Sequence, residues 1–123
     1  MAARILVVDD DECVRELMHL HLSGAGYQVQ VAEDAIVAGH LLLQEGVDLL
    51  VTDIEMPFMD GLDLVKAIRS DPAIASLPVV FVTSQPGHED AAAELGAMYL
   101  RKPLRADELL KSVATSLAPR AER

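Results

Sequence analysis

The amino-acid sequence predicts an α/β fold, a single domain built on an open, doubly wound parallel sheet. Short apolar runs rich in β-branched residues alternate along the chain with segments whose apolar residues recur at helical spacing. Strands that alternate with helices need crossover connections, which are almost always right-handed and cover both faces of a parallel sheet. A length of 123 residues suits one core. Because 51% of the residues are hydrophobic and only 3% are aromatic, that core must be mainly aliphatic.

Five apolar runs have the length and composition of strands, namely residues 4–8, 28–31, 48–52, 79–83 and 98–100. Helical stripes lie between and after them, made of Val14, Leu17, Met18 and Leu22; of Ile36, Gly39, His40 and Leu43; of Leu64, Val65 and Ile68; and of Leu109, Leu110, Val113 and Leu117. The first three helices should end where the hydrogen-bond ladder cannot continue, at Gly24 and Gly26, at Gly46, and at Asp71-Pro72. The pattern therefore predicts five βα units.

Composition also narrows the classes of function. The formal net charge is −10, whereas proteins that bind nucleic acid gather Lys and Arg on one face. We therefore expect no direct contact with nucleic acid. No apolar run approaches the roughly 20 residues that span a bilayer, so no membrane insertion is expected. The single cysteine, Cys13, cannot form an internal disulfide, and no stretch resembles a signal peptide. The expected location is the cytoplasm.

Polar side chains follow the predicted strands at their carboxyl ends, where ligands bind in open parallel sheets. Asp9, Asp10 and Asp11 follow the first strand, Asp53 the third, Thr83 and Ser84 end the fourth, and Lys102 follows the fifth. Carboxylates that meet in one cleft repel one another unless a cation neutralises them. Hard oxygen ligands with no His or Cys beside them favour Mg²⁺.

A bare metal site has no use for an ammonium and a hydroxyl, whereas a transferred phosphoryl group needs both. The lysine would neutralise charge, and the hydroxyl would donate a hydrogen bond to a phosphoryl oxygen. Asp53 is then the candidate nucleophile, because a carboxylate that attacks phosphorus forms an acyl phosphate.

Four stretches together resemble the receiver domain of two-component response regulators, including chemotaxis response regulators. They are VVDD at residues 7–10, TDIEMPFMDG at 52–61, Thr83, and YLRKP at 99–103. The resemblance covers nearly the whole chain. It implies a flavodoxin-like sheet of five parallel strands in the order 2-1-3-4-5, with residues 1–118 forming the receiver domain and 119–123 a C-terminal tail.

The resemblance also implies roles for single residues. Asp53 would accept a phosphoryl group from a phosphohistidine on a sensor histidine kinase or a histidine phosphotransfer protein. Asp10 and Asp53 would bind Mg²⁺ directly, Asp9 would bind it through a water, and the backbone carbonyl of Glu55 would be a further ligand. Lys102 would pair with the phosphoryl oxygens.

Further implied roles concern switching. Thr83 would hydrogen-bond the phosphoryl group and pull its loop inward, and Tyr99 would fill the vacated space. Glu55 and Gln85 would tune the phosphoryl lifetime, and Pro103 would follow a cis peptide. The output face would comprise the fourth helix, the fifth strand and the last helix. It would serve a downstream protein, a C-terminal effector domain or a homodimer. The only catalysis expected is the domain's own phosphoryl uptake and slow loss.

The chain departs from the family pattern in two places. Only 102 − 83 = 19 positions separate Thr83 from Lys102, about one helical turn fewer than in typical receivers. Pro86 and Gly87 also lie where the fourth helix would begin, so this helix should be short. In addition, Arg105 occupies the position where receivers often have a capping Asp or Ser.

Two other functions stay open at this point. A haloacid-dehalogenase-like phosphatase also uses an aspartyl nucleophile and Mg²⁺, although it needs an Asp two residues later, where this chain has Glu55. A degenerate receiver would bind its partner without phosphorylation. For several residues a structural role is the simpler interpretation: helix N-terminal acids for Asp11 and Glu12, a loop hydroxyl for Ser84, and packed or partly exposed positions for Cys13 and for His19, His21, His40 and His88.

Overall fold

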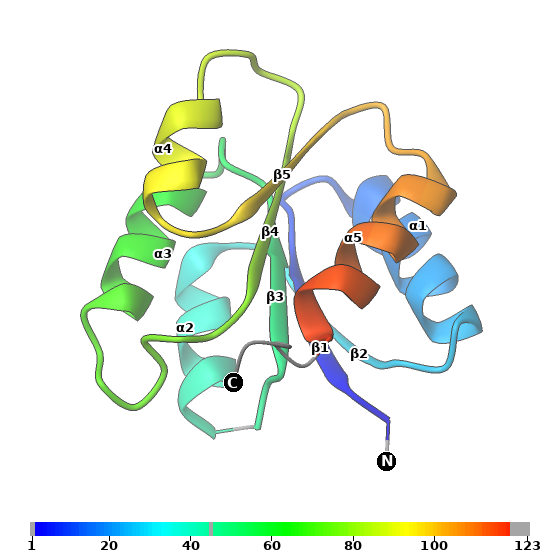
Figure 1. Cartoon of the computed structure of the whole chain (residues 1–123), viewed down its shortest axis with the longest axis horizontal. Coiled ribbons are helices and arrows are strands. Elements are labelled where there is room, and N and C mark those ends of the chain that lie inside the picture. Colours follow the sequence, from blue (N-terminus) through cyan, green and yellow to red (C-terminus); the bar gives the residue numbers. More distant parts are fainter. Residues whose placement is uncertain (1, 45, 119–123) are drawn as a thin grey trace.

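Five parallel strands form one sheet in the order β2-β1-β3-β4-β5 (Figure 1). The computed structural model describes residues 2–44 and 46–118. The strands are β1 (Arg4–Val8), β2 (Gln28–Ala32), β3 (Leu49–Thr52), β4 (Val79–Thr83) and β5 (Met98–Arg101). The predicted fold class and strand order are confirmed, and each strand boundary agrees with its prediction to within one residue. The tail expected at 119–123 lies outside the described residues.

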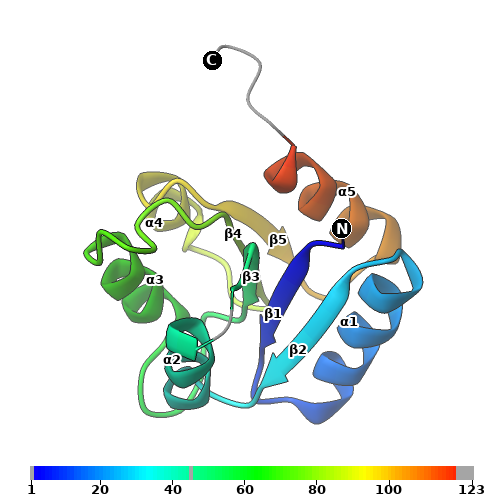
Figure 2. The same cartoon turned by 90° about the horizontal axis from the view of Figure 1, so that it is seen from below.

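Helices cover both faces of the sheet, as the crossover argument predicts. They are α1 (Glu12–Gly24), α2 (Ala35–Gln44), α3 (Gly61–Arg69), α4 (Glu89–Glu94) and α5 (Ala106–Leu117). Figure 2 shows α1 and α5 on one side of the sheet and α2, α3 and α4 on the other. The fourth helix has only six residues, which confirms the expectation of a short helix. No helix in the described part of the chain has the length and apolar content needed to cross a membrane.

The sheet separates two hydrophobic clusters, because successive residues of a strand point to opposite faces. On β1, Leu6 and Val8 face the cluster under α2, α3 and α4, whereas Ile5 and Val7 face the cluster under α1 and α5. All four are buried. Such strands therefore read as continuous apolar runs, and the runs could be recognised without any alternation.

The predicted helical stripes are mostly correct, but the stripe of α2 is wrong. Ala35, Ala38 and Leu42 are buried there, whereas Ile36 is 54% exposed and Leu43 is 77% exposed. The helix is apolar around much of its circumference, so spacing alone does not select its inner face. On α1 the stripe is correct for Met18 and Leu22, but Leu17 is 44% exposed.

The start of α1 shows what the acids directly after the first strand do. Asp11 is the N-cap residue, and its side chain accepts hydrogen bonds from the backbone N–H groups of Cys13 at 2.9 Å and Val14 at 3.4 Å. This confirms its expected role at the helix N-terminus. Cys13 is exposed, so the expectation that its side chain packs inside is wrong.

Candidate functional site

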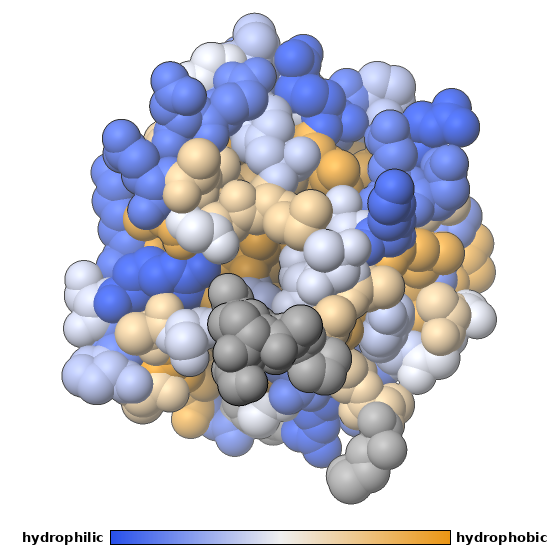
Figure 3. All heavy atoms as spheres, viewed as in Figure 1, coloured by the Kyte–Doolittle hydropathy of each residue, from blue (hydrophilic) through white to orange (hydrophobic). Residues whose placement is uncertain are grey.

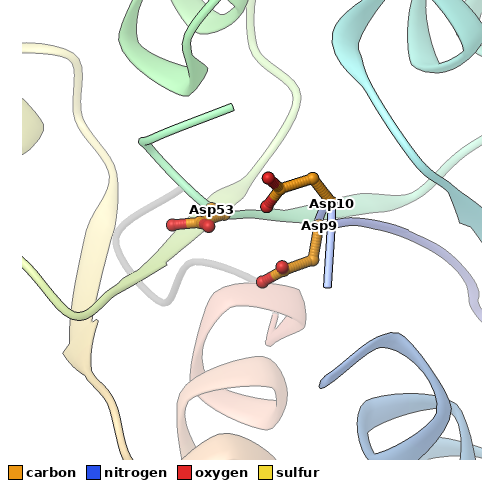
Figure 4. A group of neighbouring side chains, drawn as sticks. All are labelled: Asp9, Asp10 and Asp53. Atoms are coloured by element: carbon orange, nitrogen blue, oxygen red, sulfur yellow. The ribbon is translucent and has the colours of Figure 1, made fainter. Parts of the chain in front are cut away.

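Three carboxylates meet at the carboxyl ends of β1 and β3. Asp9, Asp10 and Asp53 each offer an oxygen atom, and these atoms all lie within 4.8 Å of one another (Figure 4). The parallel register pairs Val8 with Thr52, so the residues after each strand must be neighbours. The site is therefore a direct consequence of two strands ending at the same level of the sheet.

Asp53 is held firmly and is almost fully buried. Its backbone N–H donates to the carbonyl of Val8 at 2.9 Å, and its Oδ1 accepts from the N–H of Ile54 at 2.7 Å. Only 5% of the residue is exposed. Burial, and next the charge of Asp9, raise the pKa of Asp53 to about 6, although Lys102 acts in the opposite direction.

Lys102 brings one positive charge to the three carboxylates. Its Nζ lies 2.9 Å from Oδ2 of Asp9 and 3.3 Å from Oδ2 of Asp53. The backbone N–H of Lys102 donates to the carbonyl of Thr83 at 2.9 Å, and the peptide to Pro103 is cis, as the resemblance implies. Burial lowers the pKa of Lys102, but hydrogen bonds and charge from the two carboxylates outweigh it, and the pKa is raised.

The two acids after β1 lie in different surroundings. Asp9 is fully buried, and besides Lys102 it accepts a hydrogen bond at Oδ1 from the N–H of Asp11 at 2.9 Å. Its backbone carbonyl accepts from the guanidinium of Arg15 at 2.6 Å. Asp10 is exposed. Both oxygens of Asp9 are thus already engaged within the protein, whereas Asp10 faces solvent and can reach a cation.

The hydroxyl of Thr83 is engaged by a side chain of the neighbouring loop. Thr83 Oγ1 donates to Oε1 of Glu55 at 2.6 Å and accepts from the N–H of Gln85 at 3.2 Å. The hydroxyl of Tyr99 donates to the carbonyl of Gln85 at 2.9 Å. The predicted switch residues Thr83 and Tyr99 and the predicted tuning residue Glu55 therefore meet in one network, which Gln85 joins through its backbone.

Two residues with a part in this site were missed by reasoning from sequence. His88 Nε2 lies 3.0 Å from Oε2 of Glu55, and no sequence signal points to this contact across 33 positions. Gly61 backs the nucleophile, because a Cβ atom there would come 2.1 Å from the carbonyl oxygen of Asp53. Its N–H donates to the carbonyl of Ile54 at 2.7 Å. The last letter of TDIEMPFMDG pointed to Gly61, but only the close approach explains it.

The fold and the site, with three carboxylates beside a lysine on a sheet of this strand order, can now be compared with those of known proteins. The model of the family described as response regulator receiver domain matches residues 5–114. The chain belongs to this family. It is therefore a receiver domain of two-component signalling, and its family is not that of the haloacid-dehalogenase-like phosphatases.

Relatives and solved structures agree with this family. The receiver is 39% identical over 113 residues to response regulator MprA of Mycobacterium bovis (strain BCG / Pasteur 1173P2). The matched region covers 89% of this chain and 48% of MprA. The chain thus spans about half the length of the curated relatives it matches.

Two solved structures show the same fold. The chemotaxis response regulator CheY4 of Vibrio cholerae has a TM-score of 0.88 at 30% identity, covering 95% of this chain and 100% of that one. TrrA from Thermotoga maritima, solved in complex with Mg²⁺-BeF, has a TM-score of 0.84 at 30% identity, covering 94% of this chain and 99% of that one.

Proposed function

We propose that this receiver accepts a phosphoryl group on Asp53 from a phosphohistidine of a sensor histidine kinase or a histidine phosphotransfer protein. The observation that carries the proposal is the contact of one ammonium group with two of three converging carboxylates. Such a site holds a carboxylate nucleophile, a fixed cation and room for a second cation around one point. Family membership supports the same function.

The donor set suits Mg²⁺. It consists of oxygens only, and one lysine leaves three ionised carboxylates with a net charge of −2, which a divalent ion would neutralise. Asp10 and Asp53 would hold the ion directly, with the backbone carbonyl of Glu55. Asp9 would act through a water, because both of its oxygens already accept hydrogen bonds. The relative TrrA was solved with Mg²⁺-BeF, which agrees with this assignment.

In the transfer step, a carboxylate oxygen of Asp53 attacks phosphorus while the bond from phosphorus to the imidazole nitrogen breaks. The electron pair of that bond stays on the departing imidazole, and Asp53 becomes an acyl phosphate. Lys102 would move from the resting carboxylates to a phosphoryl oxygen, and the hydroxyl of Thr83 would donate to another. Mg²⁺, when bound, supplies further neutralisation of the phosphoryl charge.

Catalysis in this proposal is limited to the domain's own phosphoryl uptake and its slow loss to water. Glu55 and Gln85 would set the lifetime, because both lie beside Thr83. We expect Glu55→Asn to keep phosphoryl transfer and change the half-life of the acyl phosphate. An unchanged half-life would remove Glu55 from this role.

The phosphoryl state would be transmitted through Thr83 and Tyr99 to the face formed by α4, β5 and α5. On the side of the molecule seen in Figure 3, hydrophobic side chains lie in the middle and again at the right and lower left, with hydrophilic ones above them. On β5, Met98 is 37% exposed, and Tyr99 and Leu100 are half-buried. This face would bind a downstream protein, a C-terminal effector domain or a second copy. An effector domain would follow the receiver, which we place at residues 1–118, and curated relatives are about twice as long.

The test is the intact mass of the chain before and after acetyl phosphate with Mg²⁺. Wild type should gain one phosphoryl group, and Asp53→Ala should gain none. Asp63→Ala, which removes an exposed carboxylate from α3, is the matched control and should behave as wild type. Removing the metal with EDTA should abolish the gain. A wild-type chain that stays unmodified would instead favour a degenerate receiver, which binds its partner without phosphorylation.

A further inference from the structure

The carboxylate of Glu55 ties the end of β4 to the start of α4. Its Oε1 accepts from the hydroxyl of Thr83 at 2.6 Å, and its Oε2 lies 3.0 Å from Nε2 of His88. An ionised carboxylate can only accept hydrogen bonds, so both hydrogens come from the partners. One side chain from the loop after β3 thus holds two residues that are 28 and 33 positions away.

His88 lies where α4 begins but does not serve the helix as a cap. It is the N-cap residue of α4, and its side chain makes no capping hydrogen bond. Its imidazole instead contacts Glu55; the His88 side chain is 30% exposed and that of Glu55 is 42% exposed. The contact therefore fixes the rotamer of Glu55 and joins the first turn of α4 to the loop after β3.

A hydroxyl has one hydrogen to donate, so Thr83 cannot fully serve Glu55 and a phosphoryl oxygen at the same time. The hydrogen bond to Glu55 is short and charge-assisted, the stronger kind of hydrogen bond. Before Thr83 can turn to a phosphoryl group on Asp53, this bond must break. A phosphoryl dianion would also repel the nearby carboxylate of Glu55 and so favour its departure.

We propose that His88 is a positioning residue for the Thr83 switch. Through Glu55 it holds the Thr83 hydroxyl in the resting orientation and so opposes the phosphorylated state. When Thr83 leaves, Glu55 loses one of its two partners, and the contact that holds the start of α4 weakens. The inference rests on the proposed role of Asp53 and Thr83, and adds a residue that the resting state needs.

The experiment measures the affinity of the chain for beryllofluoride with Mg²⁺ at one fixed pH. His88→Ala should bind this phosphoryl mimic about two to five times more tightly than wild type, the range expected for one weak polar contact. His88→Gln, which keeps an N–H donor of similar reach, should restore wild-type affinity. His40→Ala, which removes an exposed histidine from α2, is the matched control and should change nothing.

A double-mutant cycle with Thr83→Ala separates positioning from a general structural effect. Without the Thr83 hydroxyl there is nothing for Glu55 to hold, so adding His88→Ala should leave the affinity unchanged. An equal gain in both backgrounds would overturn the inference. Unchanged or weaker binding by His88→Ala alone would also overturn it while leaving the proposed function intact. Failure of wild type to bind the mimic at all would instead count against the proposed function.

Discussion

The ammonium nitrogen of Lys102 lies 2.9 Å from Oδ2 of Asp9, a fully buried carboxylate 93 positions earlier in the chain. The contact joins the loop after β5 to the end of β1 across the breadth of the site. It balances one negative charge, and so makes the burial of Asp9 and Asp53 in one site tolerable. The same lysine reaches Asp53 at 3.3 Å, so its loss affects both acids.

Lys102→Met should therefore destabilise the metal-free protein. Removing one partner of a buried ion pair leaves an uncompensated charge, and since the lysine side chain is 17% exposed we expect a loss of about 2 kcal/mol in the free energy of unfolding. Urea denaturation measures it. Lys66→Met, an exposed position on α3, should change the value by less than about 0.5 kcal/mol. Equal effects at the two positions would show that the Asp9 contact contributes nothing.

The raised pKa of Asp53 predicts how the free energy of unfolding depends on pH, and the sign of this dependence differs with and without metal. In the folded protein the pKa of Asp53 is raised to about 6, whereas the ordinary pKa of an aspartate side chain is 3.8. Lowering the pH from about 6 to about 4 therefore progressively relieves a destabilisation of about 3 kcal/mol when no metal is bound. With Mg²⁺, the same proton competes with the ion, and the stabilisation that Mg²⁺ contributes should decline over this range.

The pH prediction is checked by urea denaturation of wild type and Asp53→Asn between about pH 7 and pH 5. The metal-free difference between the two should shrink as the pH falls, since protonated Asp53 and Asn are both neutral. Asp63→Asn, which removes an exposed carboxylate, is the matched control and is measured over the same pH range. A wild-type to Asp53→Asn difference that stays constant would mean that Asp53 titrates near its ordinary value.

Gly61→Ala should damage both the fold and the site. The new Cβ would come 2.1 Å from the backbone carbonyl oxygen of Asp53, and a backbone atom cannot swing aside as a side chain can. We expect a loss of about 2–3 kcal/mol in the free energy of unfolding and slower phosphorylation, because Asp53 itself must shift. Calorimetry and the mass assay report the two effects.

Gly39→Ala is the matched control for this change. A Cβ on this helical glycine of α2 would meet nothing within 4 Å, so the variant should be more stable by about 0.5–1 kcal/mol through helix propensity. If the alanine variants at 61 and 39 moved stability in the same direction, the close approach at Asp53 could not be the cause.

Arg69 should matter for stability but not for phosphorylation. Its guanidinium donates to the carbonyls of Leu95 at 2.8 Å, Leu77 at 2.7 Å and Ala75 at 3.1 Å, joining the end of α3 to the segments before β4 and after α4. Arg69→Met should lower the free energy of unfolding by about 2 kcal/mol, because three carbonyls lose a donor.

The control for Arg69 is Arg105→Met. Arg105 is 69% exposed at its side chain, and its guanidinium lies 3.4 Å from Asp107. Such a surface pair contributes little, so the change should stay within about 0.5 kcal/mol. Phosphorylation measured by mass should be normal in both variants. A phosphorylation defect in Arg69→Met would show that this contact also shapes the site.

The amino-acid sequence by itself determined the five strands and the residues that follow them. Strands buried on both faces must be apolar, so a run such as ILVV at residues 5–8 of β1 can be recognised from the local sequence alone. Once parallel strands pair in register, their ends lie at one level, and Asp9, Asp10 and Asp53 must meet. The polar residues after each strand were therefore enough to predict the acid triad and its lysine.

Only the tertiary structure decided which of several equivalent surfaces or partners each group uses. The inner face of α2 was predicted wrongly, because a helix apolar on most sides is oriented by the shape of the sheet beneath it. Glu55 could have met many groups, and its pairing with Thr83 and His88 depends on how two loops approach each other. Sequence patterns reflect interactions between residues close together in the chain, whereas contacts between distant loops form only when the whole core has packed.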